Sequence, residues 1–300
     1  MMRLGFIGCG NLGGHLAASL LRAGFTVTVH DRDSSLGDRL LAMGATWADN
    51  PAAVAAASDT VLTCLPSPAV SEVVLRQMLP SMQRGNTWVE MSTLGRDDIL
   101  RLAAIAADHG VRMLESPVTG GVHLAARGEI TVLAGGDKEV FEAHRAVLDA
   151  MGNRIFHIGP LGSAAVIKVI TKMLAFIHLV ADGEALMLAK RAGLDLKTAW
   201  EAISASSGTS FVHETEGQLI LNGSYDIAFS MDLALKDLGF AMGFGQEFGV
   251  PLELAGQVQQ TFVKGRAAYG GLAQSTQIVK LLEDVLGTDL RADGFPARLE

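Results

Sequence analysis

The chain has 300 residues, of which 49% are hydrophobic and 19% charged, and its formal net charge is −8 at pH 7. This length suits one large domain or two ordinary ones, and the acidic balance argues against nucleic acid as a main partner. The two cysteines, Cys9 and Cys64, lack metal-ligand spacing, so we expect small buried thiols of a cytoplasmic protein and no disulfide. We expect no signal peptide, because the first predicted strand begins at once. The longest apolar run, residues 173–180, is too short for a membrane span.

The first thirty residues predict a strand, a glycine-rich turn, a helix and a second strand. Residues 3–7 form a short apolar run, and residues 8–13 match the pattern G-x-G-x-x-G. Residues 15–23 carry leucines at helical spacing. The β-rich run of residues 25–30 ends on Asp31. This order of elements is typical of a dinucleotide-binding unit rather than of an isolated tight turn.

Each residue of this motif has a physical role. Gly8 permits the tight turn, Gly10 allows a pyrophosphate to approach the backbone, and Gly13 allows close packing of helix and sheet. The helix N-terminus attracts the phosphates. Asp31, 18 positions after Gly13, is expected to accept hydrogen bonds from the adenosine ribose. It would repel a 2′-phosphate, which favours NAD over NADP, whereas Arg32 could either pair with that phosphate or be a solvated surface charge.

The first half of the chain continues as an alternation of strands and helices. Further strands are predicted over residues 45–47, 59–65, 87–91, 111–115 and 130–134. Helices are predicted over residues 33–43, 71–78 and 96–109, and another begins at Asn50-Pro51. This alternation predicts an α/β fold of the Rossmann type, with a doubly wound, mainly parallel sheet and right-handed crossovers.

The pattern changes after residue 156. Residues 159–162 resemble a linker, and a single long helical pattern follows over residues 164–192. More helices are predicted over residues 195–204, 228–246, 251–268 and 275–285. We therefore expect a dinucleotide-binding domain at 1–162 and an all-helical substrate and oligomerisation domain at 163–300, joined by a long interdomain helix. Ligands are expected at the domain interface and at the carboxyl ends of the parallel strands.

Several motifs together resemble one family, the β-hydroxyacid dehydrogenases, which include 3-hydroxyisobutyrate dehydrogenase and tartronate semialdehyde reductase. The resemblance spans nearly the whole chain in order. It rests on the glycine-rich opening at 5–13, Cys-Leu-Pro-Ser at 64–67, Ser-Thr at 92–93, Pro-Val-Thr-Gly-Gly at 117–121, the lysine motif at 159–168 and Lys-Asp-Leu at 236–238.

The resemblance implies a site for the substrate carboxylate at Thr119, Gly120 and Gly121, where threonine replaces the usual serine and keeps the hydroxyl donor. Without the resemblance to the family, residues 119–121 would be interpreted as an ordinary turn after a strand. Two glycines expose successive backbone N–H groups, which suits a carboxylate.

Lys168 is implied to be the general acid/base, taking the hydroxyl proton as hydride leaves for the nicotinamide. Its apolar flanks at 164–167 and 169–170 predict a side chain that points into a cleft, where desolvation lowers a lysine pKa.

The chain departs from the family four residues later, where Lys172 stands in place of an asparagine that helps to hold the substrate. Lys168 and Lys172 share a helix face, so their charges would disfavour each other and depress the pKa of Lys168 further. Lys172 could hold an anionic substrate or share the proton relay, or it could bend out to solvent. Thr171 also stands where relatives often have asparagine. These changes put the substrate, more than the reaction class, in doubt.

The motif and the resemblance together outline a cofactor site and no metal site. The cofactor residues are Gly8, Gly10, Asn11, Leu12, Gly13, Asp31, Arg32, Leu65, Pro66, Thr93 and Lys236, with Asp237 orienting Lys236. His213 follows the polar loop 206–211, which resembles the family's specificity loop, and it could lie in the pocket or on the surface.

The sequence thus favours an NAD-dependent dehydrogenase, with NADP possible, that acts on a small β-hydroxy acid or semialdehyde. An imine reductase is an alternative, although that class usually lacks the lysine, and a decarboxylating sugar-phosphate dehydrogenase typically has a larger helical domain. A non-catalytic dinucleotide-binding scaffold is the other alternative. We expect a homodimer or homotetramer and neither nucleic acid nor membrane as a partner.

Overall fold

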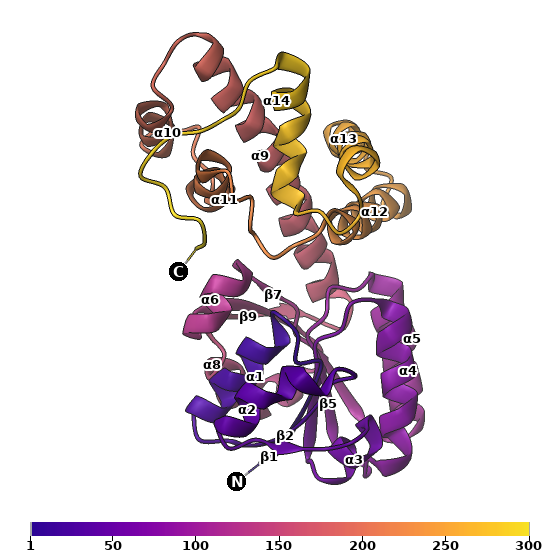
Figure 1. The fold of residues 1–300 in the computed structure, drawn as a ribbon. Helices are drawn as coiled ribbons and strands as arrows, with labels where there is room; N and C mark the ends of the chain where they lie inside the picture. Colours follow the sequence, from indigo (N-terminus) through magenta and orange to yellow (C-terminus); the bar gives the residue numbers. More distant parts are fainter. Residues whose placement is uncertain (1, 300) are drawn as a thin grey trace. The chain divides into compact units, whose positions relative to one another are not determined.

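A computed structural model describes residues 2–299 of the chain. It divides into two compact units, Met1–Lys168 and Val169–Glu300, here called unit 1 and unit 2. Unit 1 contains the sheet and unit 2 is helical (Figure 1). Cys9 is buried, as the sequence predicts, whereas Cys64 is only half-buried.

Unit 1 is built on one mainly parallel sheet, whose described strands follow the order β3-β2-β1-β4-β5-β6-β8-β7, with β9 paired to β8. Among the described strands of this sheet, only the pairings of β8 with β6 and with β7 are antiparallel. The strands are β1 (Arg3–Ile7), β2 (Thr26–His30), β3 (Thr46–Trp47), β4 (Thr60–Thr63), β5 (Thr87–Glu90), β6 (Arg112–Glu115), β7 (Val118–Thr119), β8 (Ile130–Gly135) and β9 (Gly152–Gly159). The predicted doubly wound, mainly parallel sheet is confirmed.

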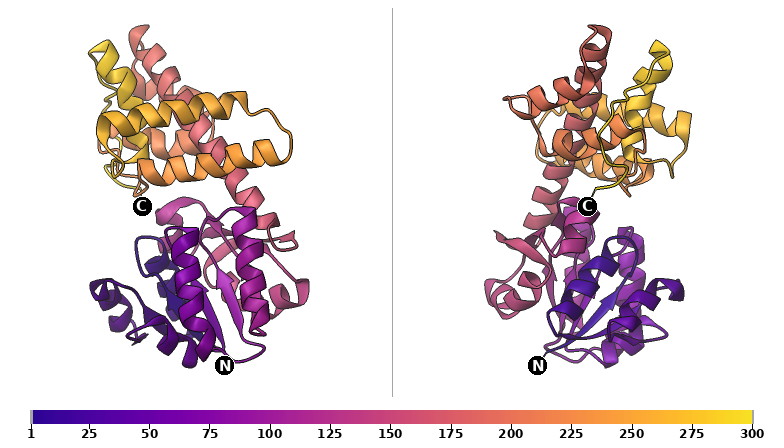
Figure 2. Two further views of the ribbon diagram at one scale, coloured as in Figure 1. Left: turned by 90° about the vertical axis from the view of Figure 1, so that its right-hand side faces the viewer. Right: turned by 60° about the vertical axis from the view of Figure 1, so that its left-hand side comes forward.

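Helices cover both faces of this sheet (Figures 1 and 2). One face carries α3 (Pro51–Ala56), α4 (Pro68–Met78) and α5 (Arg96–Asp108), and the other carries α1 (Gly13–Arg22), α2 (Asp38–Ala42), α6 (Gly121–Arg127), α7 (Lys138–Ala143) and α8 (Arg145–Asp149). Short 3₁₀ turns, η1 (Ser34–Gly37) and η2 (Leu79–Ser81), precede α2 and follow α4. Local sequence signals fix the start of α3. The Asn50 side chain accepts a hydrogen bond from the N–H of Ala53 at 2.9 Å, and Pro51 is the first residue of the helix.

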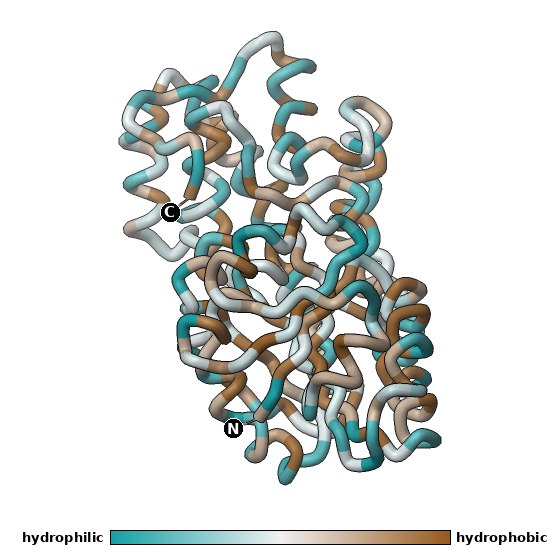
Figure 3. The backbone as a smooth tube through the Cα atoms, turned by 60° about the horizontal axis from the view of Figure 1, so that its bottom comes forward, coloured by the Kyte–Doolittle hydropathy of each residue, from teal (hydrophilic) through white to brown (hydrophobic). Residues whose placement is uncertain are grey.

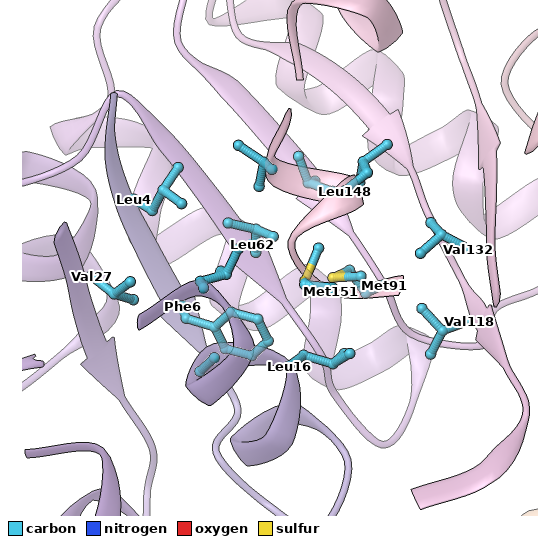
Figure 4. Packing of buried hydrophobic residues seen from close by; sticks show 14 of the residues in the cluster. Leu4, Phe6, Leu16, Val27, Leu62, Met91, Val118, Val132, Leu148 and Met151 are labelled. Atoms are coloured by element: carbon cyan, nitrogen blue, oxygen red, sulfur yellow. The ribbon is translucent and has the colours of Figure 1, made fainter. Parts of the chain in front are cut away.

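The alternation of side chains along the central strands creates a core on each face. In β5, Trp88 faces α3, α4 and α5, whereas Val89 packs with Leu16 of α1 on the other face. Figure 4 shows the core on the side of α1, where Phe6 and Leu62 lie close to Leu16. Hydrophobic and hydrophilic segments alternate along the outer helices in Figure 3, as expected for helices that bury one side only.

The named elements of unit 2 are all helices in the described residues, as the sequence predicts. The long helix α9 (Ser163–Arg191) begins in unit 1 and continues into unit 2. It is followed by α10 (Leu196–Ser204), α11 (Phe211–Asn222), α12 (Met231–Glu247), α13 (Glu253–Tyr269), η3 (Ser275–Val279) and α14 (Lys280–Leu286). The helices α12 and α13 lie side by side as an antiparallel pair (Figure 2).

The helix α9 is long and apolar enough to cross a membrane by length and composition alone. The sequence prediction considered only the shorter apolar run at 173–180. Buried helices of soluble proteins meet the same criterion, and Asp182 of α9 is buried and paired with His213 of α11. Because a buried carboxylate needs a partner of this kind, α9 faces the core of unit 2 at Asp182.

Six strands and α-helices of the described residues lie outside the sequence predictions: β7, α6, α7, α8, β9 and α11. The strand β9 occupies residues 152–159. The two adjacent polar residues Asn153 and Arg154 interrupt the alternation of apolar and polar residues that would predict a strand. The helices α6, α7 and α8 have five to seven residues each, too short for a clear helical period. The helix α11 begins directly after the predicted loop, where Ser210 caps it through the N–H of His213.

Candidate active site

The glycine-rich turn follows β1 and leads into α1. Gly8 has a φ of 98°, and a Cβ there would lie 2.3 Å from the carbonyl oxygen of Cys64. A Cβ at Gly13 would lie 1.9 Å from the carbonyl oxygen of Gly8, so only glycine allows this approach of helix and strand. A Cβ at Gly10 would meet nothing within 4 Å, which leaves its backbone open. The tight turn, the open backbone and the close approach fit a bound pyrophosphate.

The carboxylate of Asp31 lies against this turn. Its Oδ2 accepts a hydrogen bond from the N–H of Cys9 at 2.7 Å, and its Oδ1 accepts one from the N–H of Asp33 at 3.0 Å. These bonds hold the end of β2 beside the glycine-rich turn. Arg32 is exposed beside it. In the turn itself Asn11 is exposed and Leu12 half-buried, and the first turn of α1 has no acidic residue that would repel a phosphate.

The ends of β4 and β5 are joined by hydrogen bonds. The hydroxyl of Ser92 accepts a bond from the N–H of Leu65 at 2.7 Å, and the N–H of Ser92 donates to Oε1 of Glu90 at 2.8 Å. The Thr63 hydroxyl donates to Oε2 of the same carboxyl group at 3.0 Å. Burial raises the pKa of Glu90, against the bonds from Ser92 and Thr63, which lower it.

These bonds bring the predicted cofactor residues after β4 and β5 to one edge of the sheet. Leu65 is half-buried and Pro66 is exposed after β4, and Thr93 is half-buried after β5. Because β1, β2, β4 and β5 are parallel, this is the same edge that carries the glycine-rich turn and Asp31.

The predicted carboxylate-binding loop starts where β7 ends. Thr119 is the last residue of β7, and it is half-buried. Gly120 and Gly121 follow with φ angles of 125° and 86°, two successive conformations that side chains rarely adopt. The chain then enters α6. The chain thus turns sharply on two glycines, and Gly121 is also the first residue of α6.

Lys168 lies on the second turn of α9 and is 3% exposed. The start of this helix is held by Glu115 at the end of β6. Oε1 of Glu115 accepts hydrogen bonds from the N–H groups of Gly162 at 2.6 Å and Ala164 at 3.1 Å, and Oε2 accepts one from Ala165 at 2.9 Å. Burial raises the pKa of Glu115 to about 7, against the three backbone donors, which lower it.

In unit 2 the ammonium group of Lys172 lies 4.0 Å from the ring centroid of Phe229 and 5.7 Å from that of Phe176. Both distances are those of cation–π contacts. Burial raises the pKa of Glu216 on α11 to about 7, and the positive charge of Lys172 acts against this shift. Lys172 is half-buried, lies over two aromatic rings and acts electrostatically on the carboxyl group of Glu216.

Two further charged groups of unit 2 were singled out from the sequence. Lys236 on α12 is half-buried, with its ammonium group 3.3 Å from Oδ1 of the buried Asp237. His213 is 1% exposed and lies in the core of unit 2, where its Nδ1 is 2.5 Å from Oδ1 of Asp182 and its Nε2 is 3.0 Å from the carbonyl oxygen of Trp200. Burial alone would lower the pKa of His213, but the bonds to Asp182 and to the Trp200 carbonyl raise it.

Comparison with known proteins identifies the family. Residues 3–159 match the NAD binding domain of 6-phosphogluconate dehydrogenase, and residues 162–282 match the model described as NAD-binding of NADP-dependent 3-hydroxyisobutyrate dehydrogenase. The chain belongs to the β-hydroxyacid dehydrogenase family. It is therefore an NAD(P)-dependent oxidoreductase of the hydroxyacid dehydrogenase type.

Individual members of the family resemble the chain over nearly its whole length. It is 33% identical to 2-(hydroxymethyl)glutarate dehydrogenase of Eubacterium barkeri over 293 residues, which cover 96% of this chain and 97% of that protein. The structure of 3-hydroxyisobutyrate dehydrogenase from Salmonella typhimurium matches with a TM-score of 0.88 and 29% identity, covering 94% of this chain and 100% of that chain. An imine reductase from Pseudomonas sp. is more distant, with 21% identity and a TM-score of 0.66 over 94% of this chain and 99% of that chain, and it shares the fold.

The sequence analysis missed the buried carboxyl groups Glu90 and Glu115 and the pair formed by Asp182 and His213. Glu90 and Glu115 are the last residues of two buried strands. A glutamate directly after two apolar residues at the end of each strand was the available signal, since burial of a carboxyl group requires hydrogen-bond partners. Nothing in the local sequence indicates that Asp182 and His213, 31 positions apart, lie together.

Proposed function

We propose that this β-hydroxyacid dehydrogenase transfers hydride between NAD and a small β-hydroxy acid or its semialdehyde, with Lys168 as the general acid/base. The observation that carries the proposal is the position of Lys168. It is buried on a helix whose first turn is bonded to Glu115 at the end of β6. The predicted carboxylate loop begins four residues after Glu115, at Thr119.

NAD is the proposed cofactor, with the glycine-rich turn holding its pyrophosphate and Asp31 its adenosine ribose. The Asp31 carboxylate is fixed by the N–H groups of Cys9 and Asp33 and has lone pairs left for two ribose hydroxyls. The same negative charge would repel a 2′-phosphate. Leu65, Pro66 and Thr93 would line the site at the ends of β4 and β5.

The nicotinamide supplies or accepts the hydride, and residues of the chain position the substrate and move its proton. The backbone N–H groups of Gly120 and Gly121 and the Thr119 hydroxyl would hold the substrate carboxylate. Lys168 would take the hydroxyl proton during oxidation and return it to the carbonyl oxygen during reduction. Holding the reacting groups in place accounts for much of such catalysis, and burial helps a lysine to release its proton.

Lys172 is the proposed specificity residue. The family's asparagine would offer an amide at this place, whereas Lys172 offers a cation held over Phe229 and near Glu216. We propose that it binds a second anionic or polar group of the substrate. A share in the proton relay with Lys168, one helical turn away, is the alternative role.

Lys236 is the remaining proposed cofactor contact, with Asp237 limiting its movement through their 3.3 Å ion pair.

We also propose that the protein is cytoplasmic and forms a homodimer or homotetramer. Unit 2 exposes large apolar side chains, among them Leu188, Leu254 and Leu272, which are 73%, 58% and 90% exposed. A partner chain would cover such residues, and a molar mass by light scattering equal to one chain would contradict the proposal.

The test is reduction of NAD and NADP by the wild-type protein at mildly alkaline pH. The panel contains 3-hydroxyisobutyrate, glycerate, serine, threonate, 3-hydroxypropionate and phenylserine. Turnover of at least one acid with NAD supports the proposal. Measurable NAD binding without turnover of any acid would favour the non-catalytic scaffold, and reduction of a cyclic imine without oxidation of any acid would favour the imine reductase.

A further inference from the structure

Glu115 occupies an unusual place for a carboxyl group. It is fully buried, and its backbone pairs with that of Gly135 on β8. Its two oxygens accept three backbone hydrogen bonds, all from the segment that opens α9. A negative charge at a helix N-terminus is favourable, and these bonds satisfy donors that have no partner within the helix.

The anchored segment and Lys168 belong to the same rigid element. Ala164 and Ala165 are four and three positions before Lys168, so they lie on the neighbouring turn of the same helix face. A long helical side chain projects back over the turn that precedes it. A shift of the first turn of α9 therefore moves the Lys168 ammonium by a comparable distance.

Glu115 also belongs to the strand that leads to the carboxylate loop. β6 ends at Glu115, and Thr119, Gly120 and Gly121 follow after three residues. One side chain thus connects the segment that would hold the substrate carboxylate to the helix that carries the acid/base group. A proton acceptor must lie within hydrogen-bond reach of the hydroxyl it deprotonates, so the distance between these two segments matters for the reaction.

We infer that Glu115 is a positioning residue, which fixes Lys168 relative to the carboxylate loop by holding the first turn of α9. The inference rests on the proposed role of Lys168 and adds a residue that does not touch the substrate. Gly135 supports it, because a Cβ at that position would lie 2.3 Å from Oε1 of Glu115. The strand β8 thus leaves the room that the anchored carboxyl group needs.

Two substitutions disturb the anchor in different ways. Glu115→Gln replaces one accepting oxygen by an NH₂ group, which cannot accept a bond from a backbone N–H. Gly135→Ala keeps the carboxyl group but forces it away from its partners. Both are expected to lower kcat by about 100-fold, as a misplacement near 1 Å does, with the KM for NAD unchanged. If the glutamine variant does not fold, the alanine variant still tests the inference.

A double-mutant cycle separates positioning from general damage. The cycle uses the Lys168→Ala variant, in which added ethylamine acts as the base in place of the lysine side chain. Because ethylamine is not attached to α9, Glu115 cannot position it, and Glu115→Gln should lower kcat less than threefold in this background. Glu90→Gln is the matched control. This substitution changes another buried carboxyl group at the end of a strand. It should lower kcat by the same factor with and without Lys168.

A readout without turnover isolates the anchor itself. Hydrogen exchange of the backbone amides of Gly162, Ala164 and Ala165 should be slow in the wild type and faster by at least tenfold in both variants, with the rest of α9 unchanged. Unchanged exchange would overturn the inference, and so would a kcat loss of equal size with and without Lys168. Absence of wild-type turnover would instead refute the proposed function, and the exchange measurement would still decide whether Glu115 holds the helix.

Discussion

The hydroxyl of Ser92 accepts a hydrogen bond from the backbone N–H of Leu65 at 2.7 Å. This bond joins the segments that follow β4 and β5, which carry Leu65, Pro66 and Thr93. Ser92 is itself held by the Glu90 carboxyl group through its own N–H. The shape of this part of the proposed cofactor site therefore depends on Ser92, a residue that need not touch the cofactor.

Ser92→Ala should weaken cofactor binding. It leaves the N–H of Leu65 without an acceptor in a half-buried site, at a cost of about 1 kcal/mol, so the Kd for NAD should rise by about fivefold while kcat changes little. Fluorescence titration with NADH measures this. Ser92→Thr keeps the hydroxyl and should bind like the wild type. Equal affinity in the alanine variant would show that the bond is not needed.

Asp31→Asn should move the cofactor preference toward NADP. It removes the charge that would repel a 2′-phosphate, so kcat/KM for NADP should rise by about tenfold relative to NAD. Asp33→Asn removes a charge two residues away on the exposed loop and should change the ratio less. An unchanged ratio in Asp31→Asn would mean that Asp31 does not face the ribose.

The order of substrates should change in Lys172→Asn, which restores the amide typical of the family. Loss of a charged hydrogen bond corresponds to about 10- to 100-fold in kcat/KM, and acids with a second anionic group should lose most. The matched control is Lys190→Asn, on the same helix, whose ammonium group pairs with Asp289 at 3.0 Å. If both variants keep the wild-type ranking, Lys172 does not select the substrate.

The fold was predictable because its signals are local. The glycines, the apolar strands and the helical periods define both parts of the chain, and the structure confirms the doubly wound sheet, the helical second half and the long connecting helix α9. The residues suggested for the site are mostly next to strand ends, where a local motif identifies them.

The buried polar contacts were not predictable, because they join residues that are far apart in the sequence. Glu115 holds residues 47 to 50 positions later, and Asp182 reaches His213 on another helix. His213 was placed either in the pocket or on the surface, and the structure puts it in neither, since its ring lies in the core of unit 2. Such pairings are decided by packing between elements rather than by sequence spacing.

His213 should make stability depend on pH. Its pKa is raised in the folded protein, where both ring nitrogens face acceptors, so the charged ring is favoured there. This contribution is fully present below the pKa of an unfolded histidine, about 6.5, and is lost as the pH rises through the higher folded value. The thermal midpoint of the wild type should therefore fall between about pH 6 and pH 9 by more than that of His213→Gln.

At low pH this variant should also be less stable, because removing one partner of a buried pair costs about 3–5 kcal/mol. Denaturant unfolding at pH 6 and pH 9 gives the free energy of unfolding of the wild type and of His213→Gln. It thus tests both the pH dependence and the stability difference at low pH. Parallel pH profiles for wild type and variant would contradict the assignment of a charged His213, since Glu115 and Glu216 are present in both proteins.

The central claim is that Lys168 moves the substrate proton, and the most direct measurement is kcat for Lys168→Ala with the best acid of the panel and saturating NAD. We predict a loss of about 10²- to 10⁴-fold, an unchanged Kd for NADH, and partial recovery that rises with the concentration of added ethylamine. A variant that binds NADH and oxidises the acid at the wild-type rate would contradict the account.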